Sequence, residues 1–272
     1  MKIAFVIRKD CSRCAKIAES IIELLPKDWE LIYDHEAAKY LNGKGVDLTS
    51  MEADVIITIG GDGTVLRTLQ LAKGPVLGIN MGGLGFLTEL EVDEVGSAVF
   101  KLLKGEYKIS ENMKLRVEIN GERVEDCTNE AVVHTERIAR IRQFKIYIDG
   151  HFLSTMKADG IIVATPIGSS SYSSSAGGPL LLPTLKGMVI SYLAPYSSRL
   201  KPVVVPSDSK VEIKIAGKDQ ECILILDGQR EYKVKSGDTV SISRSENNAK
   251  FISFRESIYD RIRDKVIRHV VN

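Results

Sequence analysis

The first hundred residues alternate between short apolar runs and segments whose apolar residues recur at helical spacing. The runs at 3–7, 29–33, 55–59 and 75–79 predict buried strands. Helical spacing predicts helices over 14–25, 65–72 and 92–103. Because strands that alternate with helices are joined by right-handed crossovers, this part is predicted to be α/β, with a mainly parallel, Rossmann-like sheet.

The pattern changes after about residue 105. Segments in which apolar and polar residues alternate lead into Asn120-Gly121 and Asp149-Gly150, and a shorter one leads into Asp227-Gly228. These dipeptides are typical of tight hairpin turns, so they predict an all-β, mostly antiparallel region. We therefore expect an α/β domain over 1–105, joined by the C-terminal tail 253–272, and an all-β domain over 106–252.

Composition narrows the classes of partner. The chain has 272 residues, enough for two domains, and its 37 Lys and Arg against 36 Asp and Glu give a formal net charge of +1. That balance supplies no broad basic field, so we expect no nucleic-acid partner. No apolar run approaches the roughly 20 residues of a membrane span, so we expect no membrane partner. The first ten residues do not resemble a signal peptide, and four cysteines make no disulfide framework, so a cytoplasmic location is expected.

The turn Gly60-Gly61-Asp62-Gly63-Thr64 joins a predicted strand to a predicted helix. Glycines let the backbone approach a ligand closely, and the open amides at a helix start suit phosphate oxygens. Asp62 would repel a polyphosphate unless a divalent cation lies between them or Asp62 accepts a proton from an attacking hydroxyl, and phosphoryl transfer uses both arrangements. The alternative is a plain strand-to-helix connection in which Asp62 or Thr64 caps the helix. The turn is neither the phosphate loop of P-loop enzymes nor the dinucleotide fingerprint GxGxxG.

This turn resembles the signature shared by NAD kinases, by diacylglycerol- and sphingosine-type lipid kinases and, more loosely, by phosphofructokinases. Three further stretches resemble NAD kinases in particular: Thr128-Asn129-Glu130, the long segment from Asp159 to Pro179, and Asp227-Gly228-Gln229. They occur in the family's order and cover nearly the whole chain. The chain is therefore identified as a member of the NAD kinase family by resemblance.

The resemblance implies an N-terminal α/β domain, a C-terminal all-β domain and a dinucleotide in the crevice between them. It implies transfer of the ATP γ-phosphate to the 2′-hydroxyl of the adenosine ribose of NAD, which gives NADP. Asp62 corresponds to the proposed base, and Gly61 and Gly63 shape the phosphate-side loop. A divalent cation, Mg²⁺, and ATP or inorganic polyphosphate are the implied co-reactants, and no side chain is assigned as a metal ligand.

The resemblance also assigns nucleotide-binding residues. Asn129 and Glu130 match the pair that holds adenine and ribose, although the same residues taken alone read as an Asx turn. Tyr172 corresponds to a tyrosine that stacks on adenine, and Lys157 and Asp159 to residues that contact the dinucleotide. The remaining nucleotide-site candidates are Ser170, Ser171, Ser173, Ser174, Ser175, Ala194 and Gln229. Arg67 and Arg140 are candidates for phosphate contacts, with a solvated surface charge as the alternative for each.

Several positions depart from the family pattern. Ile167 replaces a Thr or Ser, Ser169-Ser170-Ser171 replaces Ser-Thr-Ala, and Ala194-Pro195-Tyr196 stands where many members have Ser-Pro-His. We expect these changes to affect affinity and nucleotide selectivity rather than the class of reaction. The serine-rich stretch 169–175 has a flexible linker as its alternative interpretation.

The cysteines and two other functional classes offer alternative interpretations of the sequence. Cys11 and Cys14 form a CxxC, but Cys14 falls on the apolar face of the predicted helix, which favours a small buried apolar residue over a redox or metal pair. A lipid kinase is disfavoured because no basic amphipathic helix for membrane docking is present. A dinucleotide-binding regulator without catalysis is the alternative from another class. Family members are usually homo-oligomers, so the resemblance implies a homodimer or homotetramer.

Overall fold

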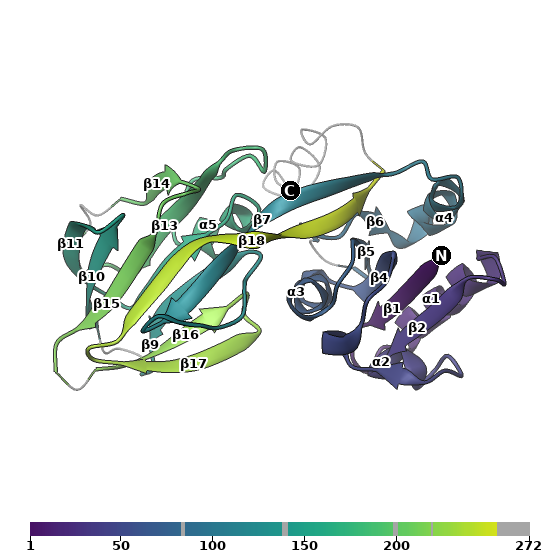
Figure 1. The fold of residues 1–272 in the computed structure, drawn as a ribbon, viewed down its shortest axis with the longest axis horizontal. Helices are drawn as coiled ribbons and strands as arrows, with labels where there is room; N and C mark the ends of the chain where they lie inside the picture. Colours follow the sequence, from purple (N-terminus) through teal and green to yellow (C-terminus); the bar gives the residue numbers. More distant parts are fainter. Residues whose placement is uncertain (83–84, 138–140, 198–200, 219, 255–272) are drawn as a thin grey trace. The chain divides into compact units, whose positions relative to one another are not determined.

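The structure, a computed structural model, describes residues 1–82, 85–137, 141–197, 201–218 and 220–254. Its contacts form two compact units (Figure 1). Among the described residues, the α/β unit comprises Met1–Glu111 and 249–254, and the β unit comprises Asn112–Asn248. Arg140 and the predicted C-terminal tail from residue 255 onward lie outside the described residues.

The α/β unit is built on a parallel sheet. Its elements are β1 (Lys2–Ile7), α1 (Ser12–Leu24), β2 (Glu30–Asp34), α2 (His35–Ala38), β3 (Gly45–Val46), the 3-10 turn η1 (Leu48–Ser50), β4 (Val55–Gly60), α3 (Asp62–Leu71), β5 (Val76–Asn80), β6 (Leu90–Glu91), the 3-10 turn η2 (Val92–Glu94) and α4 (Val95–Leu103). The strands follow the order β3-β2-β1-β4-β5, and every neighbouring pair is parallel. This confirms the predicted α/β class.

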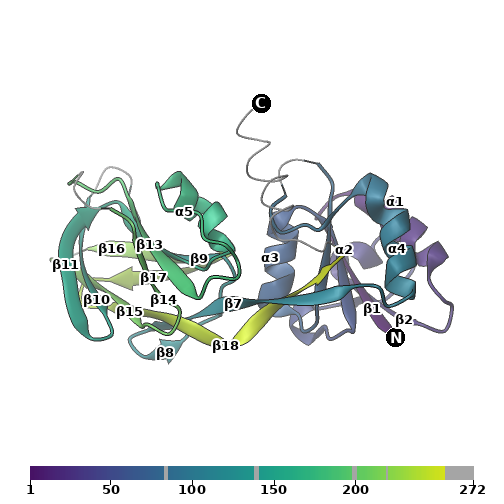
Figure 2. The ribbon, with the colours of Figure 1, turned by 90° about the horizontal axis from the view of Figure 1, so that it is seen from above.

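The two faces of this sheet pack against different helices. Ile3, Phe5 and Ile7 are fully buried on the face that packs against α1 and α4. Helices α1 and α4 lie side by side there, and α3 lies on the other face (Figure 2). The strand order therefore reverses between β1 and β4, where Ile7 pairs with Ile59. In open α/β sheets, ligands bind beyond the carboxyl ends of the strands at such a switch point.

The β unit is a sandwich of antiparallel strands. Its elements are β7 (Lys108–Ile119) and β18 (Thr239–Ser253), which both extend into the α/β unit, together with β8 (Glu122–Arg123), β9 (Glu130–Thr135), β10 (Arg142–Ile148), β11 (His151–Ala158), β12 (Gly160–Ala164), the 3-10 turn η3 (Gly168–Ser170), α5 (Tyr172–Ser175), β13 (Gly187–Leu193), β14 (Val203–Pro206), β15 (Val211–Ala216), β16 (Glu221–Leu226) and β17 (Arg230–Lys235). One sheet has the order β14-β13-β12-β9-β16-β17, and the other contains β11-β10-β15-β18. Both sheets contribute to one hydrophobic core.

The predicted hairpin turns are present, and their conformation explains the sequence. Both central residues of each turn have positive φ: Asn120 and Gly121 at 52° and 86°, Asp149 and Gly150 at 51° and 78°, Asp227 and Gly228 at 51° and 63°. Asn, Asp and Gly adopt this left-handed region most readily. The all-β class of the second unit is confirmed.

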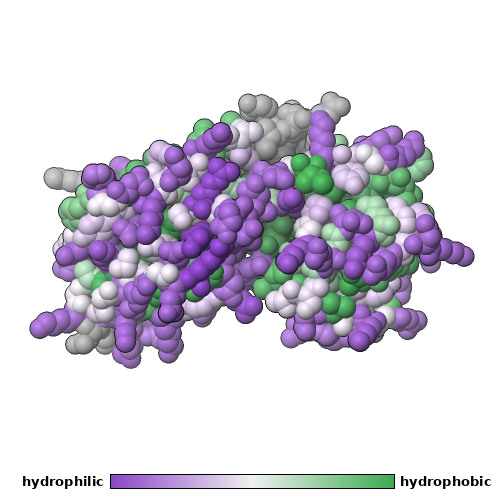
Figure 3. All heavy atoms as spheres, viewed as in Figure 1, coloured by the Kyte–Doolittle hydropathy of each residue, from purple (hydrophilic) through white to green (hydrophobic). Residues whose placement is uncertain are grey.

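On the face of the β unit drawn in Figure 3, hydrophilic side chains predominate. Among the described residues, no helix is long and apolar enough to cross a membrane.

Candidate functional site

Helix α3 begins directly at the glycine-rich turn. Its N-cap is Gly61, which has extended backbone angles, and no side chain caps the helix. The capping alternative for Asp62 and Thr64 is therefore wrong. Because the first amides of a helix have no acceptor within it, the N–H groups of Asp62 and Gly63 remain available to an anion.

The Asp62 carboxylate holds the loop that follows β5. Oδ1 accepts hydrogen bonds from the amides of Leu87 (3.0 Å) and Thr88 (3.3 Å), and Oδ2 accepts one from Phe86 (2.8 Å). A carboxylate oxygen has two acceptor positions, so these amides fill Oδ1 and leave one position on Oδ2. Asp62 is thus oriented by the backbone and retains one acceptor position for a hydroxyl.

Two glycines of the turn have different structural requirements. A Cβ at Gly60 would lie 2.4 Å from Thr64 Oγ1 and 3.1 Å from Arg8 Cβ, so glycine is needed for packing. A Cβ at Gly61 would have no atom within 4 Å. The fold therefore does not require glycine at 61, and the open space beside it is available to a ligand.

Arg67 is exposed on α3, close enough for its charge to act on a buried carboxylate, that of Asp34. Burial raises the pKa of Asp34, while hydrogen bonds from the amides of Ala37 and Ile7 and the charge of Arg67 lower it. Arg67 therefore lies at the carboxyl edge of the sheet, as a phosphate contact would.

Asp227 organises the Asn129–Glu130 pair. Its side chain is buried in the turn between β16 and β17, and it accepts hydrogen bonds from the amides of Thr128 (2.7 Å), Asn129 (2.7 Å) and Glu130 (3.1 Å). Its own amide donates to Glu130 O at 3.0 Å. Sequence reasoning interpreted Asp227 as a turn residue and did not assign it this role. The Asp-Gly-Gln stretch marked the position but not the contact.

The loop after β12 packs on the same segment. Thr165 donates through Oγ1 to Thr128 O at 2.7 Å and through its amide to Asn129 O at 2.9 Å. A Cβ at Gly168 would lie 2.0 Å from Asn129 O, so only glycine permits this approach. Residues 128–130 are therefore fixed on one side by Asp227 and on the other by the 165–168 loop.

This rigid segment presents buried polar atoms with unused hydrogen-bonding capacity. Thr128 Oγ1, Asn129 Oδ1 and Glu130 Oε2 are buried and have no hydrogen-bond partner among the described residues. Ser171 donates to the other Glu130 oxygen at 3.4 Å. Because buried polar groups in folded proteins are nearly always paired, these atoms indicate a ligand with matching donors and acceptors.

Two buried carboxyl groups share this site, and their pKa values differ. Burial raises the pKa of Glu130 to about 8, and the charge of Asp227 adds to the effect. Burial raises the pKa of Asp227 to about 6, but the amides of residues 128–130 and the charge of Lys114 oppose the rise. The site therefore favours the neutral form of Glu130 more strongly than that of Asp227.

Glu130 makes stability depend on pH. Its pKa is higher in the folded protein than the ordinary value of 4.5, so folding favours the protonated form. Its stabilising contribution is complete below that ordinary value and is lost as pH rises towards about 8. We expect the free energy of unfolding of Glu130→Gln to fall less between pH 5 and pH 8 than that of the wild type, by up to about 1.4 kcal/mol per pH unit. Urea unfolding at several pH values measures this, and parallel curves would contradict the assignment.

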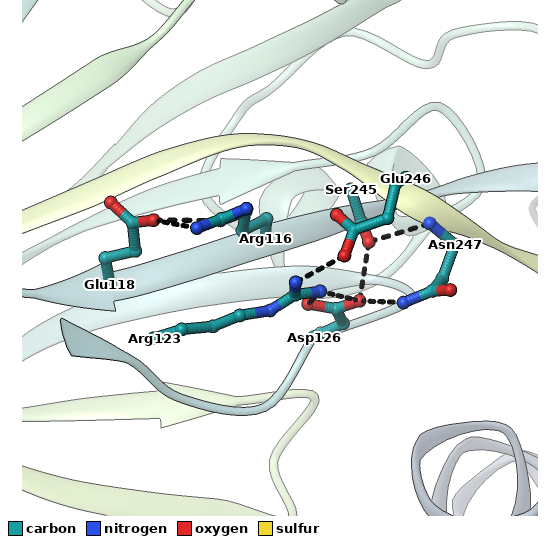
Figure 4. Close-up of polar contacts among 7 residues, drawn as sticks. All are labelled: Arg116, Glu118, Arg123, Asp126, Ser245, Glu246 and Asn247. Carbon is teal, nitrogen blue, oxygen red and sulfur yellow. Dashed lines mark hydrogen bonds and ion pairs between the residues drawn. The ribbon is translucent and has the colours of Figure 1, made fainter. Parts of the chain in front are cut away.

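A network of hydrogen bonds and ion pairs around Asp126 stabilises the chain just before residues 128–130. Arg123 donates to both oxygens of Asp126, at 2.8 and 3.0 Å, and also contacts Glu246 (Figure 4). Ser245 and Asn247 on β18 donate to Asp126 as well. Asp126 is thus held from two elements, and it precedes Thr128 by only two residues.

The serine-rich stretch is not a linker. It forms η3 and α5, and Ser169 and Ser173 are fully buried. Ser173 shares a 2.8 Å hydrogen bond with Ser191. Ser170 donates to Ile167 O at 2.9 Å. Ser174 and Ser175 are exposed, and Tyr172 is 43% exposed, which leaves its ring available to a base.

Other predicted site residues lie away from Asn129 and Glu130. On the ladder between β9 and β12, Glu130 pairs with Ala164, whereas Asp159 bonds to Thr135 at the other end. Five strand residues at ~3.4 Å each separate these positions by roughly 17 Å.

Lys157 and Ala194 lie at the Asp159 end of the strand. Lys157 O accepts a hydrogen bond from the amide of Tyr196, and Ala194 follows Leu193, whose carbonyl accepts one from the amide of Asp159. Ala194 has a φ of 42°, which is uncommon for alanine. Gln229 is exposed after the β16–β17 turn.

The structure corrects the interpretation of Cys14 as a free cysteine that acts as a small buried apolar residue. Cys14 is fully buried as expected, but it forms a disulfide with Cys11. Cys127 and Cys222 are free and buried.

Comparison with family models and comparison with curated proteins both match this chain to NAD kinases. Family models of the ATP-NAD kinase N-terminal and C-terminal domains match residues 11–107 and 128–254. NAD kinases of Thermoplasma acidophilum and Thermoplasma volcanium are 88% and 79% identical over 272 residues, which is the full length of both chains in each case.

Solved structures show the same fold. A yeast NADH kinase complexed with NADH has a TM-score of 0.90 at 21% identity, covering 98% of this chain and 87% of the other. An NAD kinase from Archaeoglobus fulgidus in complex with ATP has a TM-score of 0.76 at 27% identity, covering 97% and 99%.

Proposed function

Because the chain belongs to the NAD kinase family, we propose that it transfers the γ-phosphate of ATP to the 2′-hydroxyl of the adenosine ribose of NAD, giving NADP. The observation that carries this proposal is the buried pair Asn129 and Glu130. Asp227 and the 165–168 loop hold it rigidly, and it has acceptor atoms without partners among the described residues. Such a pair suits a ligand that offers both an amino group and hydroxyl groups.

The adenosine half of NAD has these groups. Asn129 Oδ1 would accept a hydrogen bond from the amino group of adenine. The neutral carboxyl of Glu130 both donates and accepts, so it would pair with a ribose hydroxyl. Tyr172, with its partly exposed ring, would stack on the base. Lys157, Asp159 and Ala194, at the far end of β12, are proposed to contact a more distant part of the dinucleotide.

The phosphoryl donor would bind at the start of α3. The open amides of Asp62 and Gly63 would donate to its phosphate oxygens, and Arg67 would add positive charge. The remaining acceptor position on Asp62 Oδ2 would take the proton of the 2′-hydroxyl as that oxygen attacks the γ-phosphorus. The bond from the γ-phosphorus to its bridging oxygen then breaks, and ADP leaves.

A divalent cation is the remaining part of this chemistry. Among the described residues, no group of three or more His, Cys, Asp or Glu side chains could hold a metal. Mg²⁺ in kinases is bound largely by substrate phosphates, so the donor phosphates would hold it, because the remaining acceptor position of Asp62 is taken by the 2′-hydroxyl. When bound, the ion would neutralise charge on the transferring phosphoryl group.

A substitution at Gly61 tests whether the phosphates of the donor lie close to the turn, because it should leave the stability of the fold nearly unchanged. In Gly61→Ala the new methyl group meets no protein atom and the backbone angles suit alanine, so thermal stability should stay within about 1 kcal/mol of the wild type. The methyl group should instead obstruct the donor and raise the KM for ATP by roughly tenfold.

The matched control is Gly96→Ala, on α4, where a Cβ also has open space. We expect it to leave both KM values unchanged and to stabilise the helix slightly. If Gly61→Ala binds ATP as tightly as this control does, the donor does not approach the turn.

The lipid-kinase alternative requires a direct comparison of acceptors. The purified protein would be given ATP labelled at the γ-phosphate, Mg²⁺, NAD and vesicles that contain diacylglycerol. The proposal expects the label in NADP and none in lipid. Label in lipid alone would support the alternative, and label in neither, from folded protein, would support a non-catalytic dinucleotide-binding role.

We further propose a cytoplasmic homodimer or homotetramer. The support is the resemblance to a family whose members are usually homo-oligomers. Sedimentation equilibrium would measure the state, and a monomer at assay concentration would contradict it.

A further inference from the structure

The Cys11–Cys14 disulfide has no part in the proposed reaction, yet it lies at the carboxyl edge of the parallel sheet. Cys11 is the N-cap of α1, and its Sγ accepts hydrogen bonds from the amide of Cys14 at 3.2 Å and from Arg8 Nη2 at 3.7 Å. A helix N-terminus and a neighbouring arginine both stabilise negative charge on sulfur. On reduction, this environment would favour the thiolate form of Cys11.

Arg8 connects this sulfur to the phosphate-side turn. Its amide donates to Ile59 O at 2.9 Å, and its Cβ lies against Gly60. Arg8 directly follows β1, and the glycine turn directly follows the neighbouring strand β4. The two therefore lie next to each other at the switch point of the sheet. Its side chain is exposed, and among the described residues its one side-chain hydrogen bond is the one to Cys11.

The neighbouring charges leave Arg8 available. Glu36 accepts a hydrogen bond from the amide of Asp10, but its charge is already paired with Lys39. The disulfide sulfur is uncharged and a weak acceptor, so in the oxidised protein the guanidinium can turn towards a phosphate. A thiolate at the same position would bind it more strongly.

We propose that Cys11 and Cys14 are a redox-active pair that controls Arg8 as a contact for the phosphates of the donor. In the oxidised protein Arg8 binds the donor phosphates. In the reduced protein the Cys11 thiolate competes for Arg8, and affinity for the donor falls. The inference rests on the proposed function for the identity of the donor.

The exchange needs an external dithiol, such as dithiothreitol or a protein of thioredoxin type. Its thiolate attacks Sγ of Cys11, which is 6% exposed, rather than that of Cys14, which is fully buried. The bond between the two sulfurs breaks, and Cys14 leaves as a thiolate that takes up a proton. The second thiol of the reductant then displaces Cys11, so two electrons reach the protein and the reductant becomes a disulfide.

The test compares the oxidised and reduced forms of the whole protein. Calorimetric titration with the β,γ-imido analogue of ATP and Mg²⁺ measures donor binding without turnover. Alkylation and mass spectrometry count the reactive thiols. Burial raises the pKa of Cys222 to about 11 and that of Cys127 well above its ordinary value, and Cys14 is fully buried, so at neutral pH alkylation of the folded protein reports mainly Cys11.

We expect reduction to raise the Kd of the ATP analogue by about five- to tenfold and to leave the Kd of NAD unchanged. Cys11→Ser with Cys14→Ala keeps a good N-cap and a small apolar residue, and it should bind the analogue like the oxidised protein under both conditions. Arg8→Gln should bind it weakly in both states.

An unchanged Kd after complete reduction would overturn the proposal, as would an equal shift in the cysteine double variant. NADP formation is measured separately on the same samples. A redox-dependent Kd without any NADP would contradict the proposed function and leave the redox inference standing.

Discussion

Asp62→Asn is expected to lower the turnover number by about 10²- to 10⁴-fold while the Kd of NAD changes little. An amide cannot accept the proton of the 2′-hydroxyl. It also offers one acceptor oxygen in place of two, so its NH₂ group would face a backbone N–H of the 86–88 loop. The coupled assay gives the turnover number, and calorimetry gives the affinity for NAD.

Loss of the base and loosening of the loop have different signatures. Without a base but with the loop intact, amide hydrogen exchange at residues 86–88 should match that of the wild type. A loosened loop should speed amide hydrogen exchange at residues 86–88. Asp93→Asn, an exposed aspartate in the first turn of η2, is the matched control and should keep full activity. Turnover within threefold of the wild type in Asp62→Asn would rule out Asp62 as the base.

Asp227→Asn is expected to raise the KM for NAD at least tenfold and to destabilise the protein by about 2–3 kcal/mol. The main cause is geometry: three backbone amides point at this carboxylate, and an asparagine NH₂ group cannot accept from them. Residues 128–130 would then lose the anchor that aims Asn129 and Glu130.

Asp149→Asn isolates the effect of the turn. Asp149 has the same φ of 51° before a glycine, but it is exposed and accepts a single hydrogen bond, from the amide of Lys210. Asparagine suits that conformation, so stability should change by less than about 0.5 kcal/mol. Chemical denaturation and steady-state kinetics compare the two variants. Weaker stability with an unchanged KM for NAD would mean that Asp227 supports the fold but does not position the binding pair.

Asp62 and Asp227 also show what the sequence can predict. The backbone conformation at Asp227 is determined by neighbouring residues in the sequence, so the Asp-Gly pair predicted the turn correctly. Its function depends on amides 97 to 99 residues away, which no periodicity encodes. Likewise, Asp62 was found from its glycine-rich setting, but its bonds to residues 86–88 exist only once β4 and β5 pair.

The fold was predictable where patterns were strong. Alternating strands and helices predicted the parallel sheet because each βαβ step is local. Strands β9, β12 and β13 carry no simple alternation, since most of their residues are buried, and their pairing was not predicted. The disulfide was missed because the apolar face of α1 explained Cys14 without it.

The most direct test of the central claim is NADP formation by the purified wild-type protein. The protein is incubated with ATP, Mg²⁺ and NAD, and the product is offered to a dehydrogenase that accepts only the 2′-phosphorylated dinucleotide. We expect one NADP for each ATP consumed. ATP consumption without NADP, or no reaction from folded protein in either redox state, would contradict the assignment of this chain as an NAD kinase.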